Sequence, residues 1–252
     1  MSIASPIQHS TESVSDGRAP IVRLEEVTKT YGQGDIVVHA LRGVSLQIAS
    51  GEFAAVAGPS GSGKTTMLNL ISGLDRPTAG RVFVEDREVG KMSGGELSKL
   101  RLHRIGFVFQ AYNLLPVLTA YENAEYVLML QGVSAAERRE RVMAILKQVG
   151  LEGMEQRFPR EMSGGQQQRV AIARAIASEP ALILADEPTA NVDSKTGGAL
   201  LDLMGALNAD KGISFLFSSH DQNVLTRARR LITLKDGVID GDGRPDEHDE
   251  ID

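Results

Sequence analysis

The chain has 252 residues, of which 42% are hydrophobic and 24% are charged, and it carries a formal net charge of −6 with no cysteine. This composition is typical of a globular protein with a sizeable buried core. It excludes disulfides, thiolate metal sites and a cysteine nucleophile, and no apolar run approaches the ~18 residues of a membrane span. Residues 1–20 are rich in serine and lack an apolar segment, so we expect a disordered leader there and not a signal peptide.

The first elements after the leader are predicted strands. Residues 21–27 and 44–48 alternate apolar and polar side chains, as antiparallel strands with one face in water do. Residues 53–57 are almost wholly apolar, which predicts a short buried strand. Residues 65–72 have the apolar spacing of a helix, and Gly73 is expected to end it.

The predicted buried strand runs directly into Gly58-x-x-x-x-Gly63-Lys64-Thr65, the pattern of a P-loop. Its glycines let backbone N–H groups face inward and bind an anion at a helix N-terminus. We expect Lys64 to reach the β- and γ-phosphates of ATP and Thr65 to coordinate Mg²⁺. A glycine-rich turn is the alternative, but the flanking strand and helix favour the nucleotide site. The candidate binding residues are Gly58, Pro59, Ser60, Gly61, Ser62, Gly63, Lys64, Thr65 and Thr66.

The rest of the chain alternates predicted strands and helices. Strands are expected at 81–84, 105–109, 181–185, 213–218 and 231–235, a helical insert over about 111–165, and a further helix from Ser163 to about Ser178. This alternation predicts a largely parallel sheet covered on both faces. We take 21–238 as one domain. Residues 239–252 contain seven acidic residues against Arg244 and predict a solvated, disordered tail.

A second apolar strand delivers two carboxylates. Residues 182–186 end in Asp186, which we expect to hold Mg²⁺ mostly through water. Glu187 follows and is the candidate base that orients or deprotonates the attacking water. An isolated Asp-Glu pair is usually a solvated turn, but the preceding strand and the following Pro188-Thr189 favour a catalytic role.

The segment Ser163-Gly164-Gly165-Gln166-Gln167, followed by Gln168-Arg169, resembles the signature motif of the ATP-binding cassette (ABC) ATPases. The resemblance extends from about residue 21 to 237, with all motifs in order. It implies a RecA-like P-loop NTPase core with an antiparallel β subdomain and an inserted α-helical subdomain. It also implies that Ser163, Gly164, Gly165 and Gln166 bind the γ-phosphate of ATP held by the other subunit of a dimer.

Further roles follow from the resemblance. Tyr31 matches the aromatic residue that stacks on adenine, and Gln110 matches the Q-loop glutamine that contacts Mg²⁺ and the attacking water. Ala190–Asp193 matches the D-loop, so Asp193 is expected at the dimer interface and the nucleotide. His220 matches the switch histidine that bonds the γ-phosphate. Catalysis is therefore assigned to Glu187, His220, Lys64 and Gln110, and Mg²⁺ to Thr65, Gln110 and Asp186. The D-loop departs from the family pattern in carrying Asn191-Val192.

A second Ser-Gly-Gly segment, Ser93–Glu96, precedes Gln110 and lacks the Gln-Gln-Arg continuation. We interpret Ser93 as a helix N-cap and Glu96 as the partner that completes a capping box for a helix at 97–102.

The function implied is that of an ATPase subunit that powers a membrane transporter. Two copies would close around two ATP molecules, and closure would move an integral-membrane permease through the insert near residues 113–123. The chain would then lie at the cytoplasmic face of the inner membrane, attached through the permease without inserting itself. Tyr31-Gly-Gln-Gly, Asn113-Leu-Leu-Pro116 and Thr119-Ala-Tyr-Glu-Asn123 resemble the bacterial lipoprotein-release and macrolide-export ATPases. That group implies an exporter or a system that extracts lipids or lipoproteins.

Two other functions fit the sequence less well. A soluble ABC ATPase acting on ribosomes or nucleic acid usually carries two cassettes or a coiled-coil insert, and this sequence has neither, nor a basic stripe for phosphate backbones. A P-loop kinase or GTPase would leave the Ser163 segment without a purpose, and the guanine-specific Asn-Lys-x-Asp pattern is absent.

Overall fold

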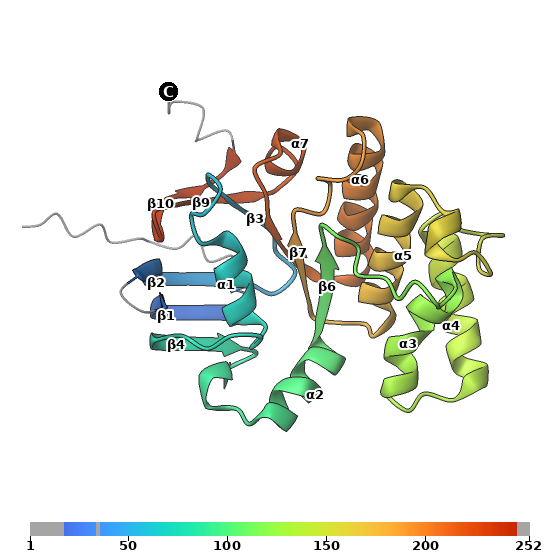
Figure 1. Cartoon of the computed structure of the whole chain (residues 1–252), viewed down its shortest axis with the longest axis horizontal. Helices are drawn as coiled ribbons and strands as arrows, with labels where there is room; N and C mark the ends of the chain where they lie inside the picture. Colours follow the sequence, from blue (N-terminus) through green and yellow to red (C-terminus); the bar gives the residue numbers. More distant parts are fainter. Residues whose placement is uncertain (1–17, 34–35, 246–252) are drawn as a thin grey trace, which may run out of the picture.

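The computed structural model describes residues 18–33 and 36–245. An antiparallel sheet with strand order β2-β1-β4-β5 lies beside a six-stranded sheet with order β10-β9-β3-β8-β7-β6 (Figure 1). The antiparallel strands are β1 (Pro20–Gln33), β2 (Ile36–Ala49), β4 (Ala79–Val84) and β5 (Arg87–Glu88). The larger sheet contains β3 (Phe53–Ala57), β6 (Ile105–Phe109), β7 (Leu182–Asp186), β8 (Ser214–Ser218), β9 (Arg230–Lys235) and β10 (Val238–Gly243).

In the larger sheet, β9, β3, β8, β7 and β6 pair in parallel, and only β10 is antiparallel to its neighbour. Because the carboxyl ends of parallel strands meet at one edge of a sheet, the residues that follow β3, β6, β7 and β8 are gathered there. These are the phosphate loop (residues 58–63), Gln110, Glu187 and His220. The fold thus brings residues from position 58 to position 220 of the sequence to one edge.

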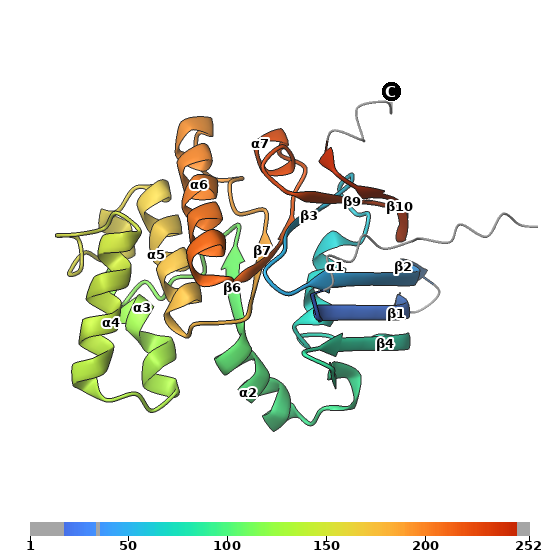
Figure 2. The same cartoon turned by 180° about the vertical axis from the view of Figure 1, so that it is seen from behind.

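Helices cover both faces of this sheet, and Figures 1 and 2 show α1 on one side with α5 and α6 on the other. The helices are α1 (Lys64–Ile71), α2 (Gly94–Arg104), α3 (Ala120–Leu130), α4 (Ala135–Gln148), α5 (Gly164–Ala177), α6 (Ser194–Lys211) and α7 (Gln222–Leu225), with 3₁₀ turns η1 (Val89–Lys91) and η2 (Pro159–Glu161).

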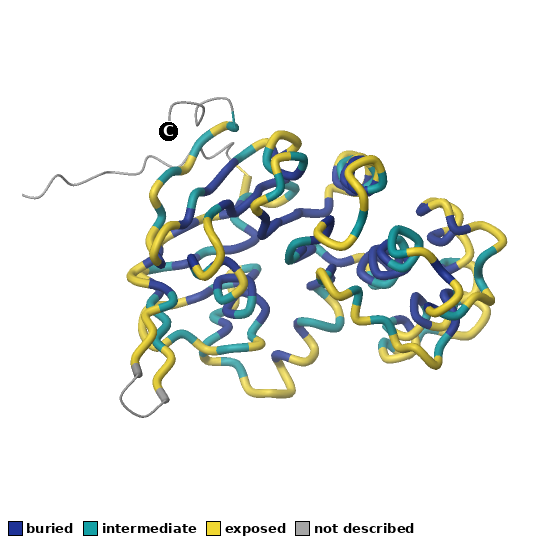
Figure 3. Tube along the Cα trace, turned by 45° about the horizontal axis from the view of Figure 1, so that its top comes forward, coloured by how far each residue is buried: buried dark blue, intermediate teal, exposed yellow. Residues whose placement is uncertain are grey.

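Alternate side chains of the strands belong to two different hydrophobic cores, one on each face of the larger sheet. Ala54 and Val56 of β3 belong to the cluster that includes α1 and the antiparallel sheet, whereas Phe53 and Ala55 belong to the cluster that includes α5 and α6. This is the period of two that a strand imposes. Because both faces are covered, all five residues of β3 are buried, as its unbroken apolar run predicts. Figure 3 shows the same trend across the molecule, with buried segments inside and exposed ones at its outer loops.

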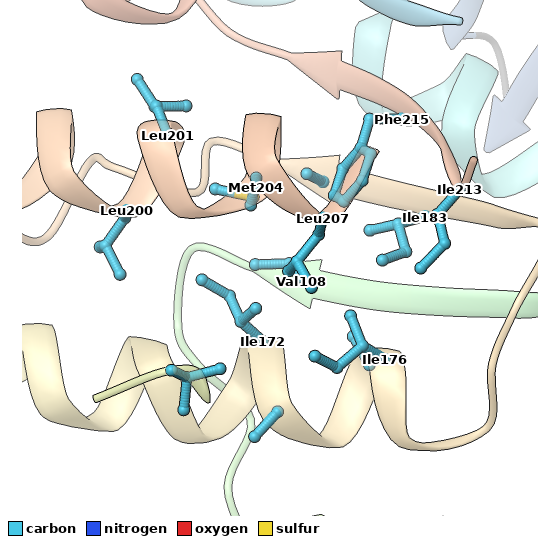
Figure 4. Packing of buried hydrophobic residues seen from close by; sticks show 14 of the residues in the cluster. Val108, Ile172, Ile176, Ile183, Leu200, Leu201, Met204, Leu207, Ile213 and Phe215 are labelled. Carbon is cyan, nitrogen blue, oxygen red and sulfur yellow. The ribbon is translucent and has the colours of Figure 1, made fainter. Parts of the chain in front are cut away.

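The second core is filled from three layers. In Figure 4, Leu200, Met204 and Leu207 of α6 lie above the sheet residues and Ile172 and Ile176 of α5 lie opposite them. Each of these five side chains is fully buried. Since truncating a buried leucine or isoleucine costs about 2–5 kcal/mol, this packing fixes α5 firmly relative to the strand that ends in Asp186.

Helices α3 and α4 lie at the end of the molecule away from the antiparallel sheet (Figure 1). They pack on α5 through Ala124, Leu128, Val142, Leu146 and Val170, all with no exposed surface. They fall within the insert expected over about 111–165. Among the described residues, no helix combines the length and the apolar character that crossing a bilayer requires.

The α/β class, the antiparallel sheet and the parallel core agree with the fold expected from the sequence. Some boundaries were wrong. The strands expected at 21–27 and 44–48 are longer, since β1 already begins at Pro20 of the expected leader and β2 begins at Ile36. The disordered tail was expected from residue 239, but Val238–Gly243 forms β10, paired with β9. Asp242 accepts two hydrogen bonds from Arg230, at 2.6 and 2.7 Å, so an acidic residue of the expected tail holds this strand in place. The remaining acidic residues 246–252, and residues 1–17 of the expected leader, lie outside the described residues.

Candidate functional site

The phosphate loop joins β3 to α1 and can be built only with glycine at two points. Gly58 has a φ of +150° and Gly63 a φ of +108°. A Cβ atom at Gly58 would lie 2.1 Å from the carbonyl oxygen of Leu234, and one at Gly63 would lie 2.4 Å from that of Ala40. The loop is therefore pressed onto the backbone of β9 and β2, and it leads directly into the N-terminus of α1, where helix amides can bind an anion.

Lys64 begins α1 and is only 7% exposed. Its Nζ donates to the carbonyl oxygens of Gly58 at 2.7 Å and Pro59 at 3.0 Å, so the ammonium group is folded back over the loop. Inside the loop, the buried Ser62 Oγ has no hydrogen-bond partner among the described residues. A buried cation and a cradle of backbone donors form a site for a multiply charged anion.

Thr65 and Asp186 come together beside Lys64. The Thr65 hydroxyl lies 3.2 and 3.1 Å from the two carboxylate oxygens of Asp186. The described residues contain no group of three or more His, Cys, Asp or Glu side chains suited to a metal ion. A hydroxyl and one carboxylate beside a phosphate site nevertheless match the donors of Mg²⁺, which usually takes one or two carboxylates and completes its shell with phosphates and water.

Glu187 has an unusual backbone for its residue type, with a φ of +46°. Its N–H donates to the carbonyl of Ser218 at 2.8 Å, and its carboxylate contacts Ser219 Oγ at 2.9 Å and His220 Nδ1 at 2.7 Å. Strain of this kind persists only where neighbours hold the residue in place. The two residues after β8 thus hold the Glu187 carboxylate in place at the sheet edge, and a carboxylate held in this way can accept a proton from water.

Two residues that the sequence did not single out support this edge. Thr189 Oγ1 donates to Asp221 Oδ2 at 2.8 Å, which ties the chain after Glu187 to the chain after His220. Burial raises the pKa of Asp221, but hydrogen bonds from Asn223 and Thr189 outweigh it and hold the pKa below its usual range. The sequence did contain a hint of their role, because each residue lies within two positions of a predicted catalytic residue.

Gln110 follows β6 and its side chain is exposed. Its carbonyl accepts a hydrogen bond from Asn191 Nδ2 at 2.8 Å, so the Q-loop is joined to the D-loop (Ala190–Asp193). Asp193 caps α6, accepting from Thr196 N at 3.0 Å and Thr196 Oγ1 at 2.6 Å. These bonds lower the pKa of Asp193, and they occupy both oxygens of its carboxylate with contacts inside the same subunit.

Tyr31 lies on β1 and is 41% exposed. Its hydroxyl donates to Asp75 Oδ2 at 2.8 Å, and Lys29 Nζ lies 4.7 Å from the ring centre while pairing with Asp75 at 2.7 Å. Burial and then the bond to Asp75 raise the pKa of Tyr31. The ring is thus held in one orientation by residues of β1 and of the turn after α1, which the sequence did not reveal.

Ser163 is the predicted residue that the fold keeps apart from the phosphate loop. It caps α5, and α5 lies on the opposite face of the sheet from α1 (Figure 1). Ser163 and Gln166 bond each other, with Ser163 N donating to Gln166 Oε1 at 2.9 Å. In the described part of the chain no hydrogen bond joins either residue to the phosphate loop. Ser163 is thus exposed at the N-terminus of a helix, where the helix dipole and free backbone amides favour an anion.

A groove of about 540 Å³ lies between α2, the free edge of β6, α3 and the end of α5. Its lining includes Leu102, Phe107, Asn113, Leu130 and Arg174. Leu130 of this lining is 55% exposed, and two apolar side chains outside the lining are exposed as well, Val117 at 77% and Met129 at 47%. Exposed apolar residues around a hollow are typical of a surface that binds a partner.

Comparisons with known proteins agree with this geometry. The family model described as ABC transporter matches residues 41–190. MJ0796, an ABC transporter ATP-binding protein of Methanocaldococcus jannaschii, is 47% identical over 227 residues, which cover 87% of this chain and 95% of that protein. A dimeric, post-hydrolysis structure of MJ0796 with ADP and Pi has a TM-score of 0.83 at 46% identity and covers 89% of this chain and 98% of that one. The macrolide export ATP-binding/permease protein MacB of Hyphomonas neptunium is 45% identical over 223 residues, which cover 88% of this chain but 34% of MacB.

Proposed function

This chain belongs to the ABC transporter family, as an ATP-binding subunit that hydrolyses ATP to power a membrane transporter, and from that premise we propose how its own residues do so. The observation that carries the proposal is the edge where Lys64, Thr65, Asp186, Glu187 and His220 meet. Binding and hydrolysis of a nucleotide need a phosphate cradle, oxygen donors for a cation, and a base, and these five residues supply all three.

In this proposal the amides of the phosphate loop and Lys64 hold the triphosphate, and Tyr31 stacks on the adenine. Thr65 and Asp186 hold Mg²⁺, together with Gln110, and the ion when bound neutralises charge on the phosphates. The remaining roles belong to the protein. Lys64 turns from the carbonyls of Gly58 and Pro59 toward the β- and γ-phosphates, an exchange of partners that needs only side-chain rotation.

Glu187 acts as the general base. It orients a water molecule for in-line attack on the γ-phosphorus and accepts its proton, while the bond from that phosphorus to the β–γ bridging oxygen breaks and ADP leaves. His220 and Ser219 hold the Glu187 carboxylate before substrate binds, at 2.7 and 2.9 Å, so little reorganisation remains for the transition state. His220 then bonds the γ-phosphate.

The pocket is completed by a second copy of this chain. Ser163 and Gln166 begin a helix on the far side of the sheet, so they cannot reach the nucleotide of their own subunit but can reach that of a facing one. The dimeric structures of MJ0796 support this arrangement. Each of the two pockets would combine Lys64 of one copy with Ser163 of the other.

The groove between α2, β6 and α3 is the proposed seat of the permease. It borders the segment after Gln110, so a partner seated there touches the chain that leads into the active edge. The permease places the subunit at the cytoplasmic face of the membrane. The similarity to MacB, in which the ATP-binding part is joined to a permease, supports an export or extraction system of that type.

The proposal is tested by ATP turnover of the purified chain and its Glu187→Gln variant. Loss of a general base lowers turnover about 10²- to 10⁴-fold. Glu140→Gln is the matched control, because Glu140 is an exposed residue of α4 and the charge change is the same. Turnover by Glu187→Gln equal to that of Glu140→Gln would remove Glu187 from the mechanism.

A further inference from the structure

The four residues after β6 take a backbone path that other residues must hold. Tyr112 has a φ of +58° and Asn113 a φ of +50°, two consecutive non-glycine residues in the left-handed region. Each is disfavoured when unsupported. Arg174 of α5 supplies the support: its guanidinium donates to the carbonyl oxygens of Tyr112, at 2.9 Å, and Asn113. The backbone path of residues 110–113 is therefore set by α5, the helix that Ser163 caps.

Two hydrogen bonds then join this segment to the D-loop. The hydroxyl of Tyr112 donates to the backbone carbonyl of Asn191 at 3.1 Å, and Asn191 Nδ2 donates to the carbonyl of Gln110 at 2.8 Å. The two bonds run in opposite directions and involve different atoms of Asn191. We name them the 112–191 latch.

The start of α5 closes over the latch. A Cβ atom at Gly164 would lie 2.7 Å from the Tyr112 hydroxyl and 3.2 Å from the Asn191 carbonyl oxygen. The latch is thus in contact with the segment after β6, the D-loop and the edge that includes Ser163. Asn191 stands four residues after Glu187 and two before Asp193, while Asn113 and Arg174 line the groove.

We infer that Tyr112 and Asn191 are positioning residues that fix the D-loop relative to the groove, so that a change in the groove is passed to the dimer interface. The inference rests on the proposed function, because it needs the D-loop to cross that interface. It explains why this chain carries Asn191 in the D-loop: the amide side chain makes one of the two bonds. The proposed function gives neither residue a contact with the nucleotide, so their effect is exerted through Gln110, which Asn191 bonds, and through Asp193 of the same loop.

The test uses the full purified chain and two variants, Tyr112→Phe and Asn191→Ala, each of which removes one bond of the latch. Turnover is measured against ATP at saturating protein and against protein concentration at saturating ATP. Binding of a fluorescent ATP analogue to dilute, monomeric protein is measured in parallel. We expect the protein concentration for half-maximal turnover to rise two- to tenfold in each variant, the range for one neutral hydrogen bond. The KM for ATP and the analogue affinity should stay within about twofold.

Tyr126→Phe is the control, because it also removes a tyrosine hydroxyl, from a residue of α3 that is 38% exposed and lies outside both segments joined by the latch. It should leave the half-maximal concentration unchanged. A purely structural latch would lower the melting temperature and the active fraction without moving that concentration, and this result would overturn the inference. In the double variant, the protein concentration for half-maximal turnover should rise by less than the product of the two single-variant increases, because both bonds join the same two loops.

Failures of the two proposals are distinguishable. If the unaltered chain shows concentration-dependent turnover and Tyr112→Phe matches it, the latch is refuted and the ATPase stands. If the unaltered chain turns over ATP at a rate independent of its concentration, the dimer and the latch both fall.

Discussion

Two Ser-Gly-Gly segments in this protein begin helices with almost the same local structure. Ser93 caps α2 with φ −67° and ψ 162°, and Ser163 caps α5 with φ −65° and ψ 161°. Both form a complete capping box, with Ser93 N bonded to Glu96 at 2.8 Å and Ser163 N bonded to Gln166 at 2.9 Å. Judged by the cap alone, either helix has the same exposed N-terminus, so local geometry does not decide which one binds a phosphate.

The surroundings of the glycines separate the two segments. At Gly94 and Gly95 an added Cβ atom would meet nothing within 4 Å. At Gly164 it would meet Tyr112 and Asn191, and at Gly165 it would lie 2.4 Å from Thr196 Cγ2. Glycine in the first segment is therefore a local choice, whereas glycine in the second lets the helix start pack against the D-loop. The two segments share one capping motif, and tertiary contacts to distant residues distinguish the segment at Ser163 from the segment at Ser93.

The largest expected contrast is between Gly165→Ala and Gly95→Ala. The new methyl at position 165 collides with Thr196, whose hydroxyl bonds Asp193 at 2.6 Å and holds its methyl group in place. Overpacking of this kind costs about 1–3 kcal/mol. We expect ATP turnover to fall as much as about 100-fold. Gly95→Ala should leave turnover unchanged and stabilise the fold by about 0.4–1 kcal/mol.

A rescue sharpens this contrast. Thr196→Ser deletes the colliding methyl and keeps the hydroxyl that bonds Asp193. Combined with Gly165→Ala it should restore most of the turnover, because the next nearest Thr196 atom is 3.7 Å from the added Cβ. Turnover that stays low in the double variant would show that the collision is not the cause.

The second contrast lies five residues after each cap. Gln168 on α5 is fully buried and donates to the carbonyl of Pro188, next to Glu187, at 2.6 Å. Its counterpart Ser98 on α2 is exposed, donates to the carbonyl oxygen of Gly94 on the same helix, and accepts a hydrogen bond from the guanidinium of Arg101. Gln168→Ala should destabilise the protein by about 2 kcal/mol, since Pro188 is left without its donor. Ser98→Ala should stay within about 0.5 kcal/mol. Denaturant unfolding of both variants checks this, and equal losses would contradict it.

Much of this comparison could be predicted from the sequence. The capping box at Ser93 is confirmed in both its bonds, because the residues involved are three apart and need no tertiary information. The family and the fold class are confirmed as well. The buried strand β3, the phosphate loop and Asp186 were predictable because an apolar run followed by a motif fixes its own place at the sheet edge.

What the sequence did not reveal depends on contacts between distant segments. Tyr31 and Asp75 are 44 residues apart, and Tyr112 and Asn191 are 79 apart, so neither pairing follows from local pattern. The expected acidic tail failed for the same reason. Asp242 was assigned to a solvated run by composition, whereas its bond to Arg230, 12 residues away, makes it part of a strand.

The third contrast compares Ser163→Ala with Ser93→Ala. Each removes an N-cap and should lower stability by about 1 kcal/mol. Only Ser163→Ala should also lower turnover, roughly tenfold, since the hydroxyl and the helix start are proposed to bind the partner copy's nucleotide. Equal stability losses with unequal turnover would separate capping from phosphate binding.

Mixing the Ser163→Ala and Lys64→Ala variants extends this test. A mixed dimer has one pocket with both defects and one pocket with neither. Turnover of the mixture should therefore exceed the mean of the two variants measured alone. A mixture equal to that mean would contradict pockets shared between copies.

The smallest contrast is one of pH, because Glu96 can titrate and Gln166 cannot. Hydrogen bonds from the Ser93 side chain and backbone lower the pKa of Glu96 below its ordinary 4.5. A carboxyl with a lowered pKa in the folded state stabilises the fold above its unfolded pKa, and that contribution is lost as the pH falls through the folded value. The stability difference between the unaltered chain and Glu96→Gln should therefore shrink as the pH is lowered from 6 to about 3. Gln166→Glu should create a second cap with the same dependence, whereas Gln166→Ala should give a difference that does not vary with pH. Denaturant unfolding at several pH values measures all three, and a Glu96→Gln difference that stays constant with pH would show that the Glu96 carboxylate adds nothing to the cap of α2.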